Sequence, residues 1–200
     1  MVERSRGKHA AGRGSRPRGG RGDLRLFVAA YPDRAWSKRA SELLGAFDLP
    51  AHRVTPVEQV HLTLCFLGSV DRARLESTAE SVGRAASGID AFEVGPVRFI
   101  TLPGRGPARL VAVECEAPPM LLELVRRLAS RLAAAPRPDP ADRFLPHLTL
   151  CRFRTPTRGF SLVRRADDLG PFRVGEIRLM RSVLLPGGAE HRELAGYELS

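Results

Sequence analysis

The sequence is poor in features that mark whole classes of protein. It has only three cysteines, Cys65, Cys115 and Cys151, with no Cys-x-x-Cys spacing. An odd, scattered set argues against a disulfide framework and fits a reducing compartment. No apolar run approaches the roughly 20 residues that cross a bilayer. The first residues also lack the apolar segment of a secretory signal. We therefore expect a cytoplasmic protein without membrane association.

Acidic and apolar side chains are almost absent from residues 1–22, which hold seven Lys/Arg and a single acid. Such a segment cannot offset its ordering entropy by burial, so we expect a disordered Arg/Gly-rich tail. A basic tail can add non-specific contacts to RNA phosphates, or it can merely improve solubility. The remaining chain, 23–200, has the length and the hydrophobic content, 43% over the whole sequence, for one domain with a core.

Within 23–200, apolar periodicity predicts strands and helices in mixed order. The expected strands cover 24–31, 52–56, 61–68, 92–100, 109–116 and 145–153, followed by a hairpin of 172–185 and 191–200. The expected helices cover 36–47, 75–86 and 121–132. Each half of the chain thus offers strands and at least one helix. This predicts an α+β fold of two pseudo-symmetric lobes, each an antiparallel sheet with helices on its outer face, around a central cleft.

One pentapeptide, HLTLC, occurs twice, beginning at His61 and at His147, in a chain with only five histidines. Alternation along a strand separates its side chains into two faces. In the first copy the faces are His61, Thr63 and Cys65 against Leu62, Leu64 and Phe66, and in the second His147, Thr149 and Cys151 against Leu148 and Leu150. A lone His-x-Thr is a weak signal, but two copies indicate two equivalent imidazoles, one from each lobe, facing a shared cleft.

Two imidazoles on opposite sides of a phosphorus atom can cleave a phosphodiester, because one can accept a proton while the other donates one. Histidine suits both roles near neutral pH. Thr63 and Thr149 lie two residues on, about 6.6 Å along each strand, where their hydroxyls can donate to phosphate oxygens. The motif therefore predicts acid–base chemistry on a phosphate ester.

The segments HLTLCFLG, HLTLCRFR, RLFVAAYP and LMRSVLLPGG together resemble the 2H phosphoesterase superfamily. Within it, they are similar to the bacterial and archaeal RNA 2′,3′-cyclic phosphodiesterases, once called 2′-5′ RNA ligases. The resemblance runs from about Arg25 to the C-terminus. It implies the 2H phosphoesterase fold, no cofactor or metal, and hydrolysis of a terminal 2′,3′-cyclic phosphate to a 2′-phosphate. The expected substrate is RNA with that end, or a small cyclic nucleotide, handled by a monomer.

The resemblance also implies roles for single residues. It gives the proton-donor role to His61 and the acceptor role to His147. It places Arg152 near the phosphate, although strict alternation would point Arg152 away from His147 unless the strand ends or twists. Phe27 matches an aromatic residue of the family's substrate cleft, and a core position explains it equally well. His191 stands where the family often has a tyrosine, which weakens the expectation of contacts from the last hairpin.

Three other hypotheses fit parts of the pattern. His61, Cys65, His147 and Cys151 could form a His2Cys2 zinc set, but residues four apart on a strand are separated by about 13 Å, too far to share one ion. A non-catalytic RNA-binding module would explain a cleft and a basic tail, but it would not need a matched acid and base. The same cleft could also ligate RNA through 2′-5′ linkages, which is the chemical reverse of transesterification.

Overall fold

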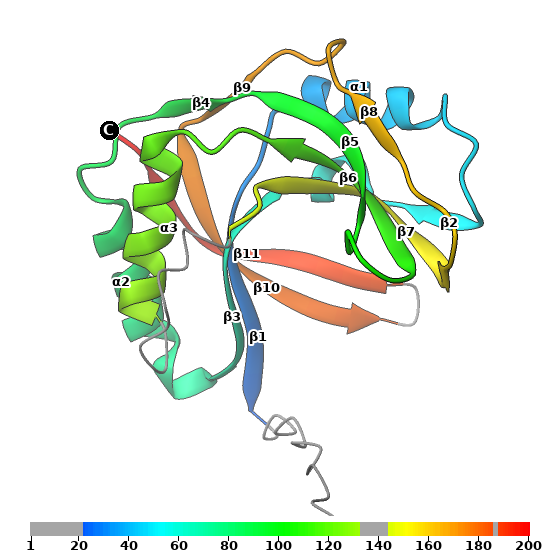
Figure 1. Ribbon diagram of the computed structural model, residues 1–200. Helices are drawn as coiled ribbons and strands as arrows, with labels where there is room; N and C mark the ends of the chain where they lie inside the picture. Colours follow the sequence, from blue (N-terminus) through cyan, green and yellow to red (C-terminus); the bar gives the residue numbers. More distant parts are fainter. Residues whose placement is uncertain (1–21, 133–143, 186–187) are drawn as a thin grey trace, which may run out of the picture.

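The computed structural model describes residues 22–132, 144–185 and 188–200, so the basic tail, apart from Gly22, lies outside the described residues. These ranges form an α+β fold with one nine-stranded antiparallel sheet and a separate two-stranded one (Figure 1). The strands are β1 (Asp23–Ala30), β2 (His52–Val54), β3 (Leu62–Asp71), β4 (Phe92–Val94), β5 (Pro96–Leu102), β6 (Ala108–Cys115), β7 (His147–Thr157), β8 (Val163–Arg165), β9 (Phe172–Val174), β10 (Glu176–Leu185) and β11 (Gly188–Glu198). The helices are α1 (Arg34–Leu44), α2 (Leu75–Ala86) and α3 (Pro119–Leu132), with short 3-10 turns η1 (Val57–Gln59) and η2 (Arg72–Arg74).

The strand order of the large sheet is symmetric about its centre. It runs β11-β10-β1-β3-β7-β6-β5-β8, with β2 added to β7. Exchanging β3 with β7, β1 with β6, β10 with β5 and β11 with β8 gives the same order read from the opposite edge of the sheet. We call β1, β3, β10 and β11 the first lobe, and β2, β5, β6, β7 and β8 the second lobe. The expected pair of pseudo-symmetric antiparallel lobes is confirmed, and the two lobes form one continuous sheet.

The two lobes meet at equivalent residues in two places. In the large sheet β3 and β7 share one antiparallel pair, Leu62 with Leu148, the residues that follow the two motif histidines. In the small sheet Glu93 lies opposite Arg173, at the centre of the β4–β9 pair. An antiparallel pair of equivalent residues is related by a local two-fold axis. Both contacts therefore mark the pseudo-two-fold axis of the molecule.

The second contact corrects the expected strands at 92–100 and 172–185, because each is split by a glycine. Gly95 separates β4 from β5 and Gly175 separates β9 from β10, so each short strand leaves the large sheet and pairs with its counterpart. The split follows a second internal repeat, FEVG at 92–95 and FRVG at 172–175. The sequence analysis missed this repeat, which was the signal that could have located the small sheet.

Two of the helices, α1 and α3, pack against the lobe opposite to the one whose strand precedes them in the sequence. Asp33 caps α1 by accepting a hydrogen bond from the Trp36 backbone N–H at 2.7 Å. This helix follows β1 of the first lobe but contacts β7 of the second. Its counterpart α3 follows β6 of the second lobe but packs against β3 and α2 (Figure 1). The lobes are therefore not the N-terminal and C-terminal halves of the sequence.

The apolar side chains divide between the two faces of the large sheet. The main core contains Leu62, Leu64, Leu148 and Leu150, all buried, together with the inner faces of the three helices. A separate small cluster, Phe27, Ala29 and Met180 with Tyr31 packed against it, lies apart from that core. Since side chains of β1 alternate, this small cluster is on the face that bears the motif histidines. No helix in the described residues has the length and apolar character to span a membrane.

Candidate active site

The two His-x-Thr segments meet at the pseudo-two-fold axis. Because Leu62 pairs with Leu148 in an antiparallel register, one step either way brings His61 next to Thr149 and His147 next to Thr63. The leucines point into the core, so the histidines and threonines share the opposite face. The structure therefore brings together all four predicted motif residues, and each histidine faces the threonine of the other lobe.

Both motif histidines are oriented by the same backbone contact. Nδ1 of His61 lies 2.6 Å from the Gln59 carbonyl oxygen, and Nδ1 of His147 lies 2.8 Å from the Leu145 carbonyl oxygen. A carbonyl oxygen can only accept a hydrogen bond, so each Nδ1 carries the proton. In the neutral ring Nε2 then keeps its lone pair. The same contact thus leaves the reactive nitrogen of each imidazole free.

A β-bulge interrupts each motif at the same place. In β3 the register moves from Ala29–Thr63 to Val28–Cys65, and in β7 from Ala112–Thr149 to Val111–Cys151. One extra residue reverses the alternation beyond that point. Cys65 and Cys151 consequently pack with the main core, so their expected place beside the histidines was wrong. The core position expected for Phe66 was also wrong, since its side chain is 54% exposed.

The bulge in β7 also explains the position of Arg152. Alternation without a bulge would turn this side chain away from His147, whereas the observed register pairs Arg152 with Leu110 beyond the bulge. Arg152 is close enough to lower the pKa of both His61 and His191 by its charge. The arginine therefore lies at the cleft. In the first lobe the corresponding residue is Phe66, which has Arg25 5.2 Å from its ring centroid.

His61 is enclosed by aromatic rings. Its ring centroid lies 5.2 Å from Phe27, 5.5 Å from Tyr31 and 5.0 Å from His191. Burial lowers the pKa of His61 to about 4, against the smaller opposing effect of the Gln59 carbonyl. The nearby charges of His191, Arg152 and His147 make smaller contributions to this decrease. His61 is therefore neutral in the free protein at pH 7.

Phe27 lies in the small apolar cluster beneath these rings and is only 3% exposed. Both sequence-based interpretations of this residue hold in part, because it is buried and also borders the site. It contacts His191 as well as His61, with ring centroids 4.9 Å apart in the former pair. Phe27 therefore keeps water from one side of the His61 ring.

His191 of β11 is a site residue that sequence reasoning missed. The sequence showed it as a single histidine without a partner, and only the pairing of β10 with β11 and of β10 with β1 brings it to His61. Its Nδ1 and the hydroxyl of Tyr31 are buried and have no hydrogen-bond partner among the described residues. Buried polar atoms usually have one. These two atoms therefore add unused hydrogen-bonding capacity to the cleft.

Tyr31 is held in place by a charged neighbour. The Arg178 guanidinium lies 5.4 Å from the Tyr31 ring centroid, and Glu176 and Glu193 bind that guanidinium at 2.7 and 3.3 Å. Burial raises the pKa of Tyr31 to about 12, although Arg178 opposes this effect. The phenol is therefore protonated at pH 7 and available as a donor.

Metal-ligand side chains do not gather at this cleft. Within residues 22–132, 144–185 and 188–200, no three His, Cys, Asp or Glu side chains come together as a group that could hold an ion. The bulges turn Cys65 and Cys151 into the core, away from the histidines with which a zinc set would need them. The His2Cys2 hypothesis therefore lacks its geometry.

Comparison with known proteins identifies the family. The sequence model of the 2′-5′ RNA ligase superfamily matches residues 31–184. A protein of Methanothermobacter thermautotrophicus named RNA 2′,3′-cyclic phosphodiesterase is 27% identical over 184 residues, 88% of this chain and 99% of that relative. The crystal structure of TT0787 of Thermus thermophilus is similar with a TM-score of 0.70 and 26% identity, over 88% of this chain and 98% of that one.

Escherichia coli LigT complexed with 3′-AMP shares the fold, with a TM-score of 0.72 and 22% identity over 89% of this chain and 99% of that one. The family match covers most of the described domain and includes both His-x-Thr segments. It confirms the resemblance to the 2H phosphoesterases that the motifs carry. This chain therefore belongs to the 2′-5′ RNA ligase superfamily.

Proposed function

We propose that the protein hydrolyses 2′,3′-cyclic phosphate ends of RNA to 2′-phosphates. The observation that carries the proposal is the meeting of two His-x-Thr segments at the pseudo-two-fold axis, each with Nε2 of its histidine free. This arrangement offers an acceptor and a donor on either side of one phosphate. The relatives named RNA 2′,3′-cyclic phosphodiesterase, each covered over most of its length, support the choice of substrate.

The proton path follows from the two rings. Water attacks phosphorus while His147 Nε2 accepts a proton from it, the bond from phosphorus to the 3′ oxygen breaks, and His61 Nε2 donates a proton to that oxygen. The products are a 2′-phosphate and a 3′-hydroxyl. His61 has a pKa of about 4 in the free protein, so this direction requires the phosphate anion to raise that pKa when the substrate binds.

The remaining site residues bind the phosphate or exclude water from the cleft. The hydroxyls of Thr63 and Thr149 donate to the non-bridging oxygens, and Arg152 adds a positive charge beside them. Phe27 keeps the His61 side of the cleft free of water. Since both histidines come from one chain, a monomer suffices for this chemistry. We expect it in the cytoplasm, where the cysteines stay reduced.

Ligation is the second candidate, because the matching family is named for 2′-5′ RNA ligases. Ligation uses the same two imidazoles with an RNA 5′-hydroxyl in place of water, so that a 2′-5′ phosphodiester forms as the bond from phosphorus to the 3′ oxygen breaks. Water is present at far higher concentration in an open cleft, so we rank hydrolysis first. The cleft need not hold a second RNA end for hydrolysis.

The test is incubation of an oligoribonucleotide ending in a 2′,3′-cyclic phosphate with the protein and a chelator, followed by identification of the ends. We expect a 2′-phosphate, no loss of rate on chelation, and loss of turnover in His61→Ala and His147→Ala. The same oligonucleotide with a 3′-phosphate is the control substrate and should remain unchanged. Intact cyclic ends after incubation with the wild-type protein would falsify the proposal.

A further inference from the structure

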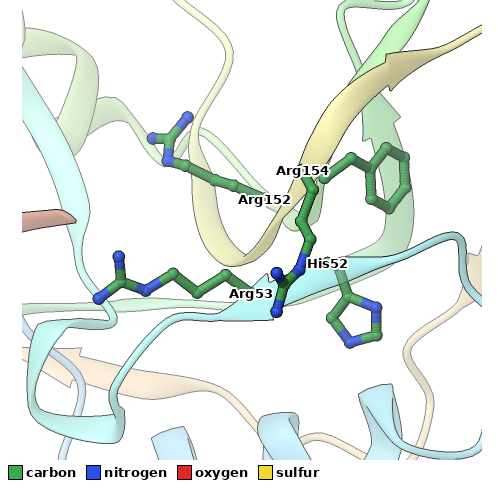
Figure 2. A pocket seen from close by; sticks show the side chains of 5 residues that line it. His52, Arg53, Arg152 and Arg154 are labelled. Carbon is green, nitrogen blue, oxygen red and sulfur yellow. The ribbon is translucent and has the colours of Figure 1, made fainter. Parts of the chain in front are cut away.

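An arginine-lined cavity lies beside the cleft. It has a volume of about 500 Å³ and is lined by His52, Arg53, Arg152, Phe153 and Arg154 (Figure 2). Figure 2 shows Arg53 and Arg152 extending to the same side of the β2–β7 pair, while Arg154 runs from β7 toward β2. The cavity is offset from the motif histidines, and Arg152 is the residue that borders both places.

The positive charge of this cavity is not neutralised by the protein. Among the described residues, no carboxylate forms an ion pair with Arg53, Arg152 or Arg154, whereas Arg98, Arg165 and Arg178 each do. Arg53 and Arg152 are also direct partners in the β2–β7 register. Like charges directly opposite on neighbouring strands destabilise a sheet unless an anion lies between them. The arrangement therefore favours an anionic ligand.

Arg53, which lines the cavity, contacts the first lobe. The Arg53 guanidinium packs against Gly188, at the start of β11, so closely that a Cβ there would overlap it. Gly188 has a φ of +127°, which a side chain would also disfavour. Arg53 thus reaches from the second lobe to the hairpin that carries His191. This contact connects an arginine of the cavity with the strand whose His191 lies beside His61.

A second arginine-lined hollow on α3 does not share these features. It is formed by Arg126, Arg127, Ser130 and Arg131 and has a volume of about 410 Å³. There Glu123 binds both Arg126 and Arg127 at 2.8 Å. This hollow is partly neutralised and belongs to the helix that covers the outer face of the first lobe. It is therefore a suitable control site.

We propose that Arg53 and Arg154 bind the phosphodiester on the 5′ side of the terminal nucleotide, with Arg152 between that phosphodiester and the reacting phosphate, so that the enzyme prefers an oligoribonucleotide to a free cyclic mononucleotide. The inference rests on the proposed function. A strand whose cyclic phosphate lies between His61 and His147 has its next phosphate one nucleotide away, and Arg152 links those two places. Guanidinium groups bind phosphate oxygens in a bidentate manner, which suits this row of arginines.

The test compares two substrates that differ by one nucleotide and therefore by one phosphodiester. Adenosine 2′,3′-cyclic phosphate has only the reacting phosphate, whereas the ApA dinucleotide with the same cyclic end also has a phosphodiester. Arg53→Gln and Arg154→Gln should each lower the ratio of kcat/KM for the dinucleotide to that for the mononucleotide by about 10-fold. Arg131→Gln removes the same charge from the α3 hollow and should leave the ratio as in the wild type. An unchanged ratio in both cavity variants would overturn the inference.

Binding gives an independent measurement that does not need turnover. The affinity for a fluorescent oligoribonucleotide with a 3′-phosphate is measured by anisotropy over a range of KCl concentrations. Each lost phosphate contact should reduce the salt slope by about 0.7 in Arg53→Gln and Arg154→Gln but not in Arg131→Gln. The basic tail is common to all proteins compared. If the wild type hydrolyses neither substrate, the proposed function fails, and equal slopes would then overturn this inference separately.

Discussion

The two lobes have the same strand order and a bulge at the same place in each motif, yet their cleft faces differ in chemistry. In the first lobe His61 is surrounded by Phe27, Tyr31 and His191. In the second lobe His147 lies opposite Glu114, which binds Arg98 at 2.6 Å. One imidazole is thus in an apolar, aromatic setting and the other is beside charged groups. A symmetric backbone with asymmetric surroundings can give two identical side chains different proton affinities.

The residues that follow the two bulges also differ in chemistry between the lobes. The bulges bring the residue five positions after each motif histidine onto the cleft face, and that residue is Phe66 in the first lobe and Arg152 in the second. The backbone therefore repeats a position without repeating its chemistry. We expect the phosphate to bind closer to the second lobe, which contains Arg152. The following predictions test this comparison, beginning with the largest effect.

The two histidines should be equivalent in their effect on turnover. His61→Ala and His147→Ala are each expected to lower kcat for the cyclic phosphate by about 10² to 10⁴, because each removes one proton transfer. The double variant should lower kcat only slightly more than either single variant, since donor and acceptor act as a unit. Rate measurements under substrate saturation check this. A fully multiplicative loss in the double variant would mean that the two rings act in separate steps.

The threonines should have smaller and nearly equal effects. Thr63→Val and Thr149→Val each remove a hydroxyl donor to a non-bridging oxygen while keeping the β-branched shape. We expect kcat to fall by up to about 10²-fold in each, the lower end for loss of one such donor. The two values come from single-turnover rates. A loss confined to one threonine would show that the phosphate is bound by one lobe alone.

Substitution of the two residues that the bulges place on the cleft face should have clearly different effects on catalysis. Arg152→Gln is expected to lower kcat/KM by about 10-fold or more, because a hydrogen bond from a charged group to phosphate is lost. Phe66→Leu, the corresponding change in the first lobe, should alter kcat/KM by no more than about 2-fold, because Phe66 is exposed and has no proposed role in binding or catalysis. Steady-state kinetics on the same substrate decide. Equal losses in both variants would remove the asymmetry that we infer.

The aromatic surroundings of His61 should determine its titration. NMR titration of the wild-type protein is expected to give a pKa of about 4 for His61. Phe27→Ala admits water beside the ring, and since burial is the main cause of the low value, the pKa should rise toward the ordinary 6.5. Addition of a 2′-phosphate product should also raise it. A value near the ordinary 6.5 in the wild type would contradict the buried, neutral His61.

The low pKa also has a consequence for stability, the smallest effect expected. The unfolded chain binds a proton at His61 below about pH 6.5, whereas the folded protein binds it only near pH 4. The unfolded state therefore binds more protons in this window, and the free energy of unfolding falls as the pH decreases from about 6.5 to about 4. His61→Gln should flatten that part of the curve. Urea unfolding at pH 7 and pH 5 measures it, with His147→Gln as the comparison.

The pattern of residues along the chain was enough to specify the fold class, the strand character of both motifs and the symmetric relation between the two motifs. Those features are local, because alternation and the repeat HLTLC can be read along the chain. The same pattern could not place Cys65, Cys151, Phe66 or Arg152, since a bulge leaves no periodic signal and depends on the register with the neighbouring strand. The FRVG repeat could have been read from the sequence.

The way the lobes combine depends instead on packing between distant segments. Packing brought His191 from the last strand onto His61, a contact between residues 130 positions apart that no local pattern encodes. It likewise placed Arg53 of β2 opposite Arg152 of β7 and against Gly188 of β11. Such contacts arise when three distant segments pack together. The motif thus defines the reacting groups, while the packing of the sheet defines the surroundings that set their charge and the path of the substrate.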